Sequence, residues 1–272
     1  MKGFFPAVIE AVRHFRARDL KQPIIVLATA DEETSMAGAR ALSDHDALQP
    51  RFAIIGEPTG LVPIRMHKGI HMQKVVIQGQ AGHSSDPSLG NNALDAMQQV
   101  LTELISLRQS FIEKYQHEGF KVPHPTLNLG CIHGGDNPNR ICGQCELQFD
   151  LRATPGMNTE DSLQLIEAKL EQLSRELNIQ IDLQPLFSGV APFEEPACSE
   201  LVKLAEKLTG HTAQSVAFAT EAPFLQNLGA QTIVMGPGSI DQAHQADEFI
   251  ALEQINPAIT VLRGFIEHFC LH

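Results

Sequence analysis

The sequence is poor in basic residues and has no stretch in which they gather. Lysine and arginine number 20 against 32 aspartate and glutamate residues, which gives a formal net charge of −12. Nucleic acids and anionic membranes attract concentrated positive charge, so this balance argues against both as the main partner. The sequence also lacks an apolar run of membrane-spanning length. We therefore expect a soluble, globular protein.

Cysteines are few and odd in number, which argues against a disulfide framework. The five cysteines have no even spacing and fit a reducing cytoplasm. Cys142 and Cys145 match a Cys-x-x-Cys metal or redox motif. However, apolar and polar residues alternate from Gln144 to Arg152, which is typical of a half-buried strand, and residues three apart on a strand face opposite ways. We interpret this pair as structural and expect a cytoplasmic protein.

What the sequence does contain is sufficient for a substantial core. Of its 272 residues, 43% are hydrophobic, and the length has room for two domains or one large one. Helix and strand patterns alternate up to about Gly69 and again after Pro185, as in α/β layers. Between them the patterns follow the βαββαβ order of a ferredoxin-like module. The sequence predicts an α/β domain of residues 1–69 and 185–272, interrupted by an inserted module of residues 70–184.

The periodicities also predict the individual elements. In the α/β domain we expect helices at 3–18, 35–43, 197–209, near 221 and at 252–270, with extended segments at 23–29, 51–55, 61–66, 213–218 and 231–235. In the insert we expect strands at 72–80, 126–132, 141–152 and 179–183, with helices from about 91 and at 159–177.

Acidic residues follow two of the predicted strands at their carboxyl ends. Glu32 and Glu33 come after an apolar run, and Glu57 follows the next predicted strand along the chain. His244 lies in a Gly-rich loop after a third strand. Ligands of open α/β sheets bind beyond the carboxyl ends of the strands, so these side chains are predicted to form one site.

The adjacent glutamates have room for two different tasks. In an extended chain neighbouring side chains point to opposite faces, so Glu32 and Glu33 do not easily chelate one ion. If the chain turns there, one carboxylate can bind a metal while the other acts as general base towards water. Carboxylates combined with an imidazole suit zinc, cobalt or manganese better than magnesium or calcium. Taken singly, the Glu32-Glu33 pair is more typical of a solvated surface, and each of the other residues is compatible with a surface group.

A set of short motifs is spread over the whole chain. They are Ala30-Asp31-Glu32-Glu33-Thr34, Ile55-Gly56-Glu57-Pro58-Thr59, His67-Lys68-Gly69, Gly82-His83-Ser84-Ser85, Asn139-Arg140-Ile141, Asp150-Leu151-Arg152, Thr220-Glu221-Ala222 and Ala243-His244. Together they resemble the two-metal aminoacylase and carboxypeptidase-like amidohydrolases. The resemblance implies a mixed-sheet, metallopeptidase-like catalytic domain, and it implies that the insert is a lid and dimerisation domain.

The same resemblance implies roles for the acids and histidines. Glu32 is expected to be the general base, which deprotonates a metal-bridging water and then protonates the departing amine. Glu33 and His244 are expected to hold one divalent metal, zinc or cobalt, and Glu57 a second. His83 is expected to reach across a homodimer and stabilise the tetrahedral oxyanion in the partner's site.

Substrate contacts follow from the resemblance as well. Asn139 and Arg152 are expected to orient the substrate α-carboxylate, which a guanidinium fork matches in shape. Thr220 and Glu221 are expected to bind substrate, with the Glu221 carboxylate facing a cationic side chain. The structural alternatives are a loop cap for His83, a turn cap for Asn139, a surface ion pair for Arg152 and compensation of a helix dipole for Glu221.

The implied reaction is hydrolysis of the amide of N2-acetyl-L-ornithine to ornithine and acetate, a step of arginine biosynthesis. Desuccinylation of succinyl-diaminopimelate, aminoacylase and peptidase activities are the alternatives on the same scaffold, and a catalytically inactive dimerising fragment is the non-enzymatic one. Family members carry a His-x-Asp metal motif and an Ala-Asp pair ahead of the position of Met1. Without them the chain offers two ligands to one metal and one to the other, so we expect weak metal binding and negligible turnover from this polypeptide alone.

Overall fold

Two units make up the computed structural model, which describes residues 2–44 and 49–271. Unit 1 is formed by Met1–His67 together with Phe193–His272, and unit 2 is the intervening Lys68–Pro192. Unit 1 is therefore discontinuous in sequence, with unit 2 inserted between two of its segments. Among the described residues, no helix combines the length and the apolar character that crossing a membrane requires.

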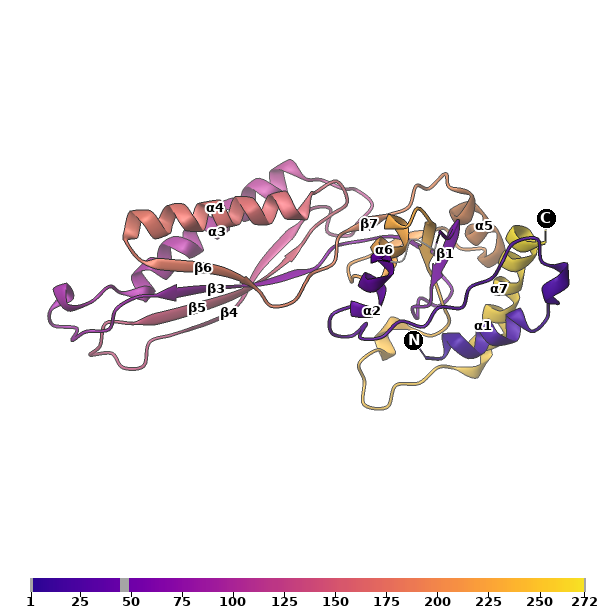
Figure 1. Ribbon diagram of the computed structural model, residues 1–272, viewed down its shortest axis with the longest axis horizontal. Coiled ribbons are helices and arrows are strands. Elements are labelled where there is room, and N and C mark those ends of the chain that lie inside the picture. Colours follow the sequence, from indigo (N-terminus) through magenta and orange to yellow (C-terminus); the bar gives the residue numbers. More distant parts are fainter. Residues whose placement is uncertain (1, 45–48, 272) are drawn as a thin grey trace. The chain divides into compact units, whose positions relative to one another are not determined.

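Unit 1 contains a mixed five-stranded sheet with helices around it (Figure 1). Its strands are β1 (Phe52–Ile55), β2 (Ile64–His67), β7 (Phe193–Glu194), β8 (Gln214–Val216) and β9 (Gln231–Val234). Its α-helices are α1 (Phe4–Val12), α2 (Ala37–Arg40), α5 (Glu200–Thr209), α6 (Ala222–Asn227) and α7 (Ile255–Cys270), and 3₁₀ turns lie at Ala17–Asp19, Ala41–Asp44, Ile240–Gln242 and Leu252–Gln254. The strand order is β1-β9-β2-β7, with β8 also paired to β2.

The parallel pair β1 and β9 brings two distant segments to one edge of this sheet. Phe52 pairs with Gln231 and Ile55 with Val234, so the carboxyl ends of both strands lie side by side. The loops that follow are hydrogen bonded, because the Thr59 N–H donates to the Gly236 carbonyl at 3.2 Å. This pairing joins the segment after Glu57 to the loop that carries His244.

Helices α1 and α7 pack through small and apolar side chains. Ala7 and Ala11, one helical turn apart, are completely buried against Ala258 and Leu262 of α7. The predicted helix 3–18 is thus shorter in the structure, since α1 ends at Val12, one residue beyond its last buried alanine. The predicted helix 35–43 is likewise reduced to α2 and the 3₁₀ turn after it.

The strand predicted at 23–29 is not formed, which corrects the sequence analysis. No described strand pairs with this segment, although β1 is an edge strand and has its outer side free. The side chains of Ile25, Val26 and Leu27 are 59%, 49% and 40% exposed, whereas the apolar run predicted burial. A cavity of about 440 Å³ is lined by this segment and by β1. The apolar run at 23–29 is therefore not sufficient to form a strand, because a strand also needs backbone hydrogen bonds to a neighbouring strand, and this segment makes none to β1.

Unit 2 is an antiparallel sheet with two long helices. Its elements are β3 (His71–Gln78), the 3₁₀ turn Pro87–Leu89, α3 (Ala93–Lys114), β4 (Thr126–Gly134), β5 (Gln144–Arg152), α4 (Thr159–Leu177) and β6 (Gln180–Pro185). The strand order β4-β5-β3-β6 and the element order βαββαβ confirm the predicted ferredoxin-like module.

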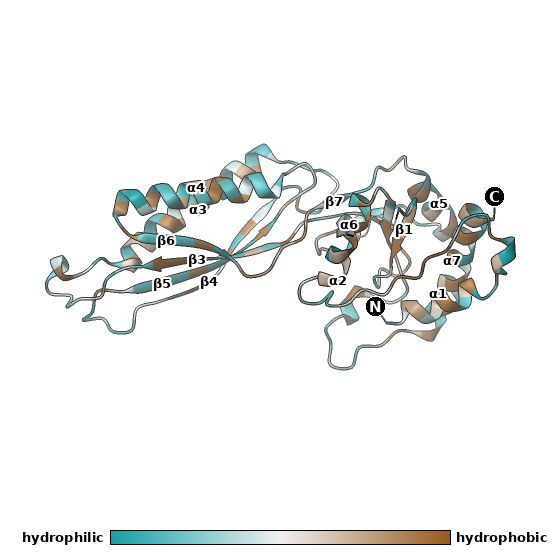
Figure 2. Ribbon diagram, in the orientation of Figure 1, coloured by the Kyte–Doolittle hydropathy of each residue, from teal (hydrophilic) through white to brown (hydrophobic). Residues whose placement is uncertain are grey.

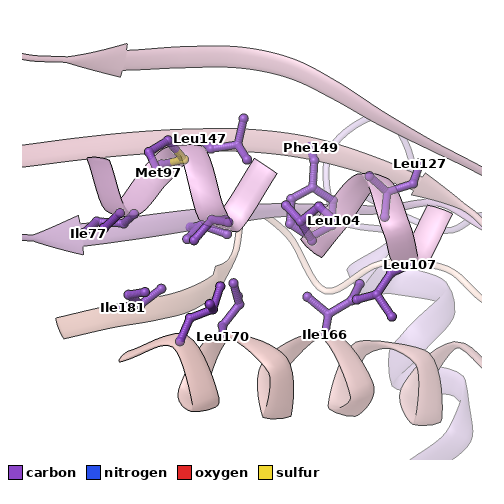
Figure 3. Close-up of a cluster of buried hydrophobic side chains, with 14 of the residues drawn as sticks. Ile77, Met97, Leu104, Leu107, Leu127, Leu147, Phe149, Ile166, Leu170 and Ile181 are labelled. Atoms are coloured by element: carbon purple, nitrogen blue, oxygen red, sulfur yellow. The ribbon is translucent and has the colours of Figure 1, made fainter. Parts of the chain in front are cut away.

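Both helices of unit 2 pack on one face of its sheet (Figure 1). In β5 the side chains alternate as predicted, with Cys145, Leu147, Phe149 and Leu151 buried. Helix α4 is banded in hydrophobic and hydrophilic residues, as an amphipathic helix should be (Figure 2). Figure 3 shows the resulting core, in which the helix residues Leu104, Leu107, Ile166 and Leu170 meet the strand residues Ile77, Leu147, Phe149 and Ile181.

Candidate active site

Glu32 and Glu33 lie together in a tight turn that begins at Asp31. Asp31 adopts a left-handed backbone conformation, with φ at 59°, and its carbonyl accepts hydrogen bonds from Ser35 N–H at 3.0 Å and Met36 N–H at 2.8 Å. Glu32 is half-buried, while Glu33 is exposed. The chain thus turns where the sequence analysis required it to, although the preceding segment is not a strand.

Glu57 is held just beyond the end of β1 and is 7% exposed. Gly56 precedes it, and a Cβ at Gly56 would overlap the ring of Phe4. A glycine at this position therefore lets α1 pack against the end of the strand that leads into Glu57.

Burial and mutual repulsion disfavour the charged forms of these acids. Burial, then the charges of Glu33 and Glu221, raise the pKa of Glu32 to about 7, against a lowering by His244. Burial, then Glu32 and Glu221, likewise raise the pKa of Glu57 to about 7. The charges of Glu33 and Glu221 thus act on both Glu32 and Glu57, so a cation bound among these carboxylates would relieve the repulsion.

His244 and Glu33 lie together at the surface of unit 1. The Nδ1 atom of His244 is 3.8 Å from an Oε atom of Glu33, and the side chains are 77% and 66% exposed. Carboxylate and imidazole are donors of the kind that zinc and cobalt bind. Within the described residues, however, no three His, Cys, Asp or Glu side chains come close enough to hold an ion together. The donors fit such a metal in kind and fall short of a complete ligand set in number.

Glu221 is buried beside the acids, at the start of α6. Its Oε2 accepts a hydrogen bond from Thr29 at 2.9 Å, and its Oε1 is buried without a hydrogen-bond partner among the described residues. Burial raises the pKa of Glu221, and the Thr29 bond lowers it. The side chain makes no capping hydrogen bond to α6, so it is not used as a helix cap.

Thr220, the other predicted substrate contact of this unit, is completely buried. Its hydroxyl accepts the Ala222 N–H at 3.2 Å, and its own N–H donates to Nε2 of the buried His67 at 3.3 Å. The structure thus gives Thr220 a part in fixing the backbone beside Glu221.

In unit 2, the loops of His83 and Asn139 are joined. Ser84 N–H donates to the Asn139 carbonyl at 3.0 Å, and His83 forms an isolated β-bridge with Arg140. Both His83 and Asn139 are exposed, and His83 Nδ1 is 2.7 Å from the Ser85 hydroxyl. These two predicted residues therefore share one end of unit 2.

Arg152 lies at the other end of the same sheet. Asn139 belongs to the connection that enters β5 at Gln144, while Arg152 ends that strand, eight residues later. Eight residues of antiparallel strand span about 27 Å. Within one copy of the chain, Asn139 and Arg152 are therefore too far apart to hold the same carboxylate, so the predicted action of both on one substrate requires a second copy.

Three residues that support these side chains were given no role by the sequence analysis. Thr29 donates to Glu221, His67 accepts from Thr220, and Asp150 accepts a hydrogen bond from Arg152 at 2.7 Å. Thr29 gives no signal in the sequence, and His67 was noted there as part of a motif without a role, because their partners are 192 and 153 residues away. Asp150 could have been found, since residues two apart on a strand share a face.

Comparisons with known proteins agree with this architecture. The peptidase dimerisation domain of the M20 family matches residues 65–178. An acetylornithine deacetylase of Erwinia tasmaniensis is 45% identical over all 272 residues, which span 71% of that protein. The structure resembles aminopeptidase PepT of Bacillus cereus, with a TM-score of 0.77 and 18% identity over 98% of this chain and 70% of PepT. It also resembles a tripeptidase of Staphylococcus aureus, with a TM-score of 0.66 and 17% identity over 89% of this chain and 62% of that one.

Proposed function

The chain belongs to the acetylornithine deacetylase family of hydrolases, and from this we propose that it acts in the metal-dependent hydrolysis of N2-acetyl-L-ornithine to ornithine and acetate. The observation that carries the proposal is the cluster of Glu32, Glu33, Glu57 and Glu221 in unit 1, with His244 beside it. We further propose that unit 1 is the catalytic domain and that unit 2, within which most of the dimerisation match lies, joins two copies.

Glu32 is the proposed general base. It takes a proton from the attacking water and returns a proton to the departing amine as the carbon–nitrogen bond breaks. Burial of Glu32 disfavours its charged form and so raises its pKa, which makes the carboxylate a readier acceptor of a proton from water. Its half-buried position limits competing hydrogen bonds from solvent.

Glu33 and His244 are the proposed ligands of one divalent metal, and Glu57 of a second. When bound, zinc or cobalt would supply a Lewis acid that polarises the amide carbonyl and acidifies water. The buried Glu57 and the exposed pair of Glu33 and His244 differ in access to solvent, so the two positions should bind with different affinities.

Glu221 is the proposed partner of the substrate side-chain ammonium. Its Oε1 atom is buried and lacks a hydrogen-bond donor among the described residues. An ammonium group supplies such a donor, and its charge would favour the ionised carboxylate. This contact would distinguish acetylornithine from uncharged N-acetyl amino acids.

A homodimer is proposed because the carboxylate-binding residues are split between the ends of unit 2. His83 and Asn139 share one end, about 27 Å along β5 from Arg152. In a symmetric dimer, one copy can supply Arg152 while the other supplies His83 and Asn139. The five cysteines are free thiols, in keeping with a proposed cytoplasmic location.

The test is release of ornithine by the purified chain in the presence of zinc or cobalt. Turnover of N2-acetyl-L-ornithine that disappears in Glu32→Gln supports the proposal, since glutamine keeps the shape of the side chain and cannot accept the proton. Turnover that survives this substitution refutes the role of Glu32. Faster turnover of succinyl-diaminopimelate or of a dipeptide would instead favour a desuccinylase or a peptidase. Absence of turnover with every metal and substrate is the result expected if this polypeptide supplies too few metal ligands by itself, and it favours the non-catalytic dimerising fragment.

A further inference from the structure

One edge of the Arg152 guanidinium is hydrogen bonded to an acid on the same strand. Its Nε donates to Asp150 Oδ2 at 2.7 Å, and the two side chains are 27% and 26% exposed. Asp150 and Arg152 are two residues apart in β5, so they project from the same face of the sheet. This face is opposite to the one that carries the buried Leu147, Phe149 and Leu151.

The hydrogen bond to Asp150 leaves the other edge of the Arg152 guanidinium available to a ligand. Arginine has five N–H donors in a planar fork. Among the described residues, Asp150 is the one acceptor for the Arg152 guanidinium, and it takes the Nε hydrogen. The edge formed by the two Nη groups, which matches both oxygens of a carboxylate, is left for a ligand.

The surroundings of the pair favour an anion. Lys68 is buried, donates to the His124 carbonyl at 2.7 Å and lies within electrostatic reach of Arg152. Lys68 and Arg152 thus place two positive charges near Asp150. Repulsion between the cations would disperse them without that acid, and an incoming carboxylate would reduce it.

Stabilisation of the fold does not by itself explain the Asp150–Arg152 ion pair. Asp150 Oδ1 is buried and has no hydrogen-bond partner among the described residues. A buried carboxylate oxygen left without a donor costs free energy, which offsets the attraction within the ion pair. Orientation of Arg152 is a function that accounts for this arrangement.

We propose that Asp150 is a positioning residue, which holds the Arg152 guanidinium through Nε so that its Nη edge receives the α-carboxylate of the substrate. The inference rests on the proposed function, because it takes Arg152 as the group that binds the substrate. It adds a residue for which the motif comparison assigned no role.

The experiment compares N2-acetyl-L-ornithine with its α-carboxamide, which lacks the carboxylate charge. Dissociation constants of both are measured by NMR titration of the intact chain, so that the result does not depend on turnover. In the wild type we expect the acid to bind more tightly than the amide. Asp150→Asn should reduce this preference about tenfold, since the neutral amide loses the charge-assisted bond to Nε.

Charge alone predicts the opposite sign. Removing the negative charge of Asp150 would make the site more positive and strengthen binding of the acid. An increased preference for the acid in Asp150→Asn therefore overturns the positioning role. Asp150→Glu, which keeps the charge, should retain more of the preference than the asparagine variant, and it provides a second test if Asp150→Asn fails to fold.

Glu146→Gln is the matched control. Glu146 lies on the same face of β5, pairs with Lys74 at 3.4 Å, and has a side-chain exposure of 25%. Glu146→Gln should leave the preference for the acid over the amide unchanged. If Glu146→Gln reduces this preference as much as Asp150→Asn does, the effect is a general one of charge on this sheet and the proposal is overturned.

Arg152→Lys separates the two levels of inference. If the wild type and Arg152→Lys show equal preference, the proposed α-carboxylate role of Arg152 fails. If Arg152→Lys loses the preference while Asp150→Asn keeps it, the role of Arg152 stands and that of Asp150 is refuted. If Asp150 acts by orienting Arg152, the variant that carries both Asp150→Asn and Arg152→Lys should show the same preference for the acid as Arg152→Lys alone.

Discussion

At the scale of single residues, Glu221 is the position where substrate choice can be tested. We expect Glu221→Gln to lower kcat/KM for N2-acetyl-L-ornithine by about 10- to 100-fold, because an ion-paired ammonium would lose about 1.5–3 kcal/mol with its charged partner. The value for N-acetyl-L-norvaline, which lacks the ammonium, should change much less. The measurement is the ratio of kcat/KM for the two substrates.

Glu194→Gln provides a control for this ratio. Glu194 is an acid of the same unit whose carboxylate pairs with Arg65 at 3.2 Å. If both variants shift the ratio equally, a general change in the charge of unit 1 explains the effect. If neither shifts it, Glu221 does not recognise the substrate side chain.

Glu57 gives a second prediction, on the stability of the metal-free chain. Its pKa is raised from 4.5 to about 7, so between these values the folded chain holds a proton that the unfolded chain has released. Stability must then fall as pH rises through this window, by up to about 1.4 kcal/mol per pH unit for one group. The loss begins above the unfolded pKa and is complete above the folded one.

Urea unfolding of the wild type and of Glu57→Gln, at pH 5, 6 and 7 with a chelator present, isolates this contribution. Glutamine does not titrate, so the wild type should lose stability relative to the variant as the pH rises. A difference between the two that stays constant across the three pH values contradicts the raised pKa.

At the scale of elements, the start of α4 depends on one side chain. Asn158 accepts hydrogen bonds from the N–H groups of Glu160 at 3.0 Å and Asp161 at 3.3 Å. We expect Asn158→Ala to cost about 1 kcal/mol of unfolding free energy, because two of the free N–H groups at the helix start lose their acceptor. Urea unfolding followed by circular dichroism measures the loss.

Asn92→Ala is the comparison for that prediction. Asn92 caps α3 and accepts one such bond, from Leu94 N–H at 3.0 Å. It should cost the same or less. A larger loss from Asn92→Ala would show that the number of capping bonds does not determine the effect.

The elements that the sequence predicted best are those with their own start signals and a complete buried face. Helix α4 matches the predicted 159–177, because Asn158 caps it and its apolar residues recur at helical spacing. The prediction of a strand at 23–29 was wrong because an apolar run indicates a tendency to be buried, whereas a strand also needs a pairing partner, which local sequence does not reveal. The two-residue strand β7 was not predicted either, since pairing with β2 rather than any pattern defines it.

At the scale of the whole molecule, the sequence indicated why the acids lie near one another, whereas it gave no information on the distance between Asn139 and Arg152. Glu57 and the His244 loop follow parallel neighbours β1 and β9, and the rule about carboxyl ends of strands predicted that meeting. Asn139 and Arg152 were identified from short sequence motifs, and such motifs do not indicate how far apart two residues lie in the fold. The hairpin of β4 and β5 separates them by the length of a strand, so the proposed site needs two copies of the chain.

Mixing two inactive variants tests that requirement. Glu32→Gln removes the proposed base of a copy's own site, and His83→Ala removes the residue proposed to act in the partner's site. In a mixed dimer, one site combines Glu32 of the second variant with His83 of the first and is intact. Random exchange of equal amounts should therefore restore about a quarter of the wild-type activity, since half the dimers are mixed and each has one working site. The measurement is ornithine release before and after mixing under conditions that allow subunit exchange. If activity stays at the level of the separate variants although mixed dimers are detected, His83 serves its own copy, and the two ends of unit 2 must act in different sites.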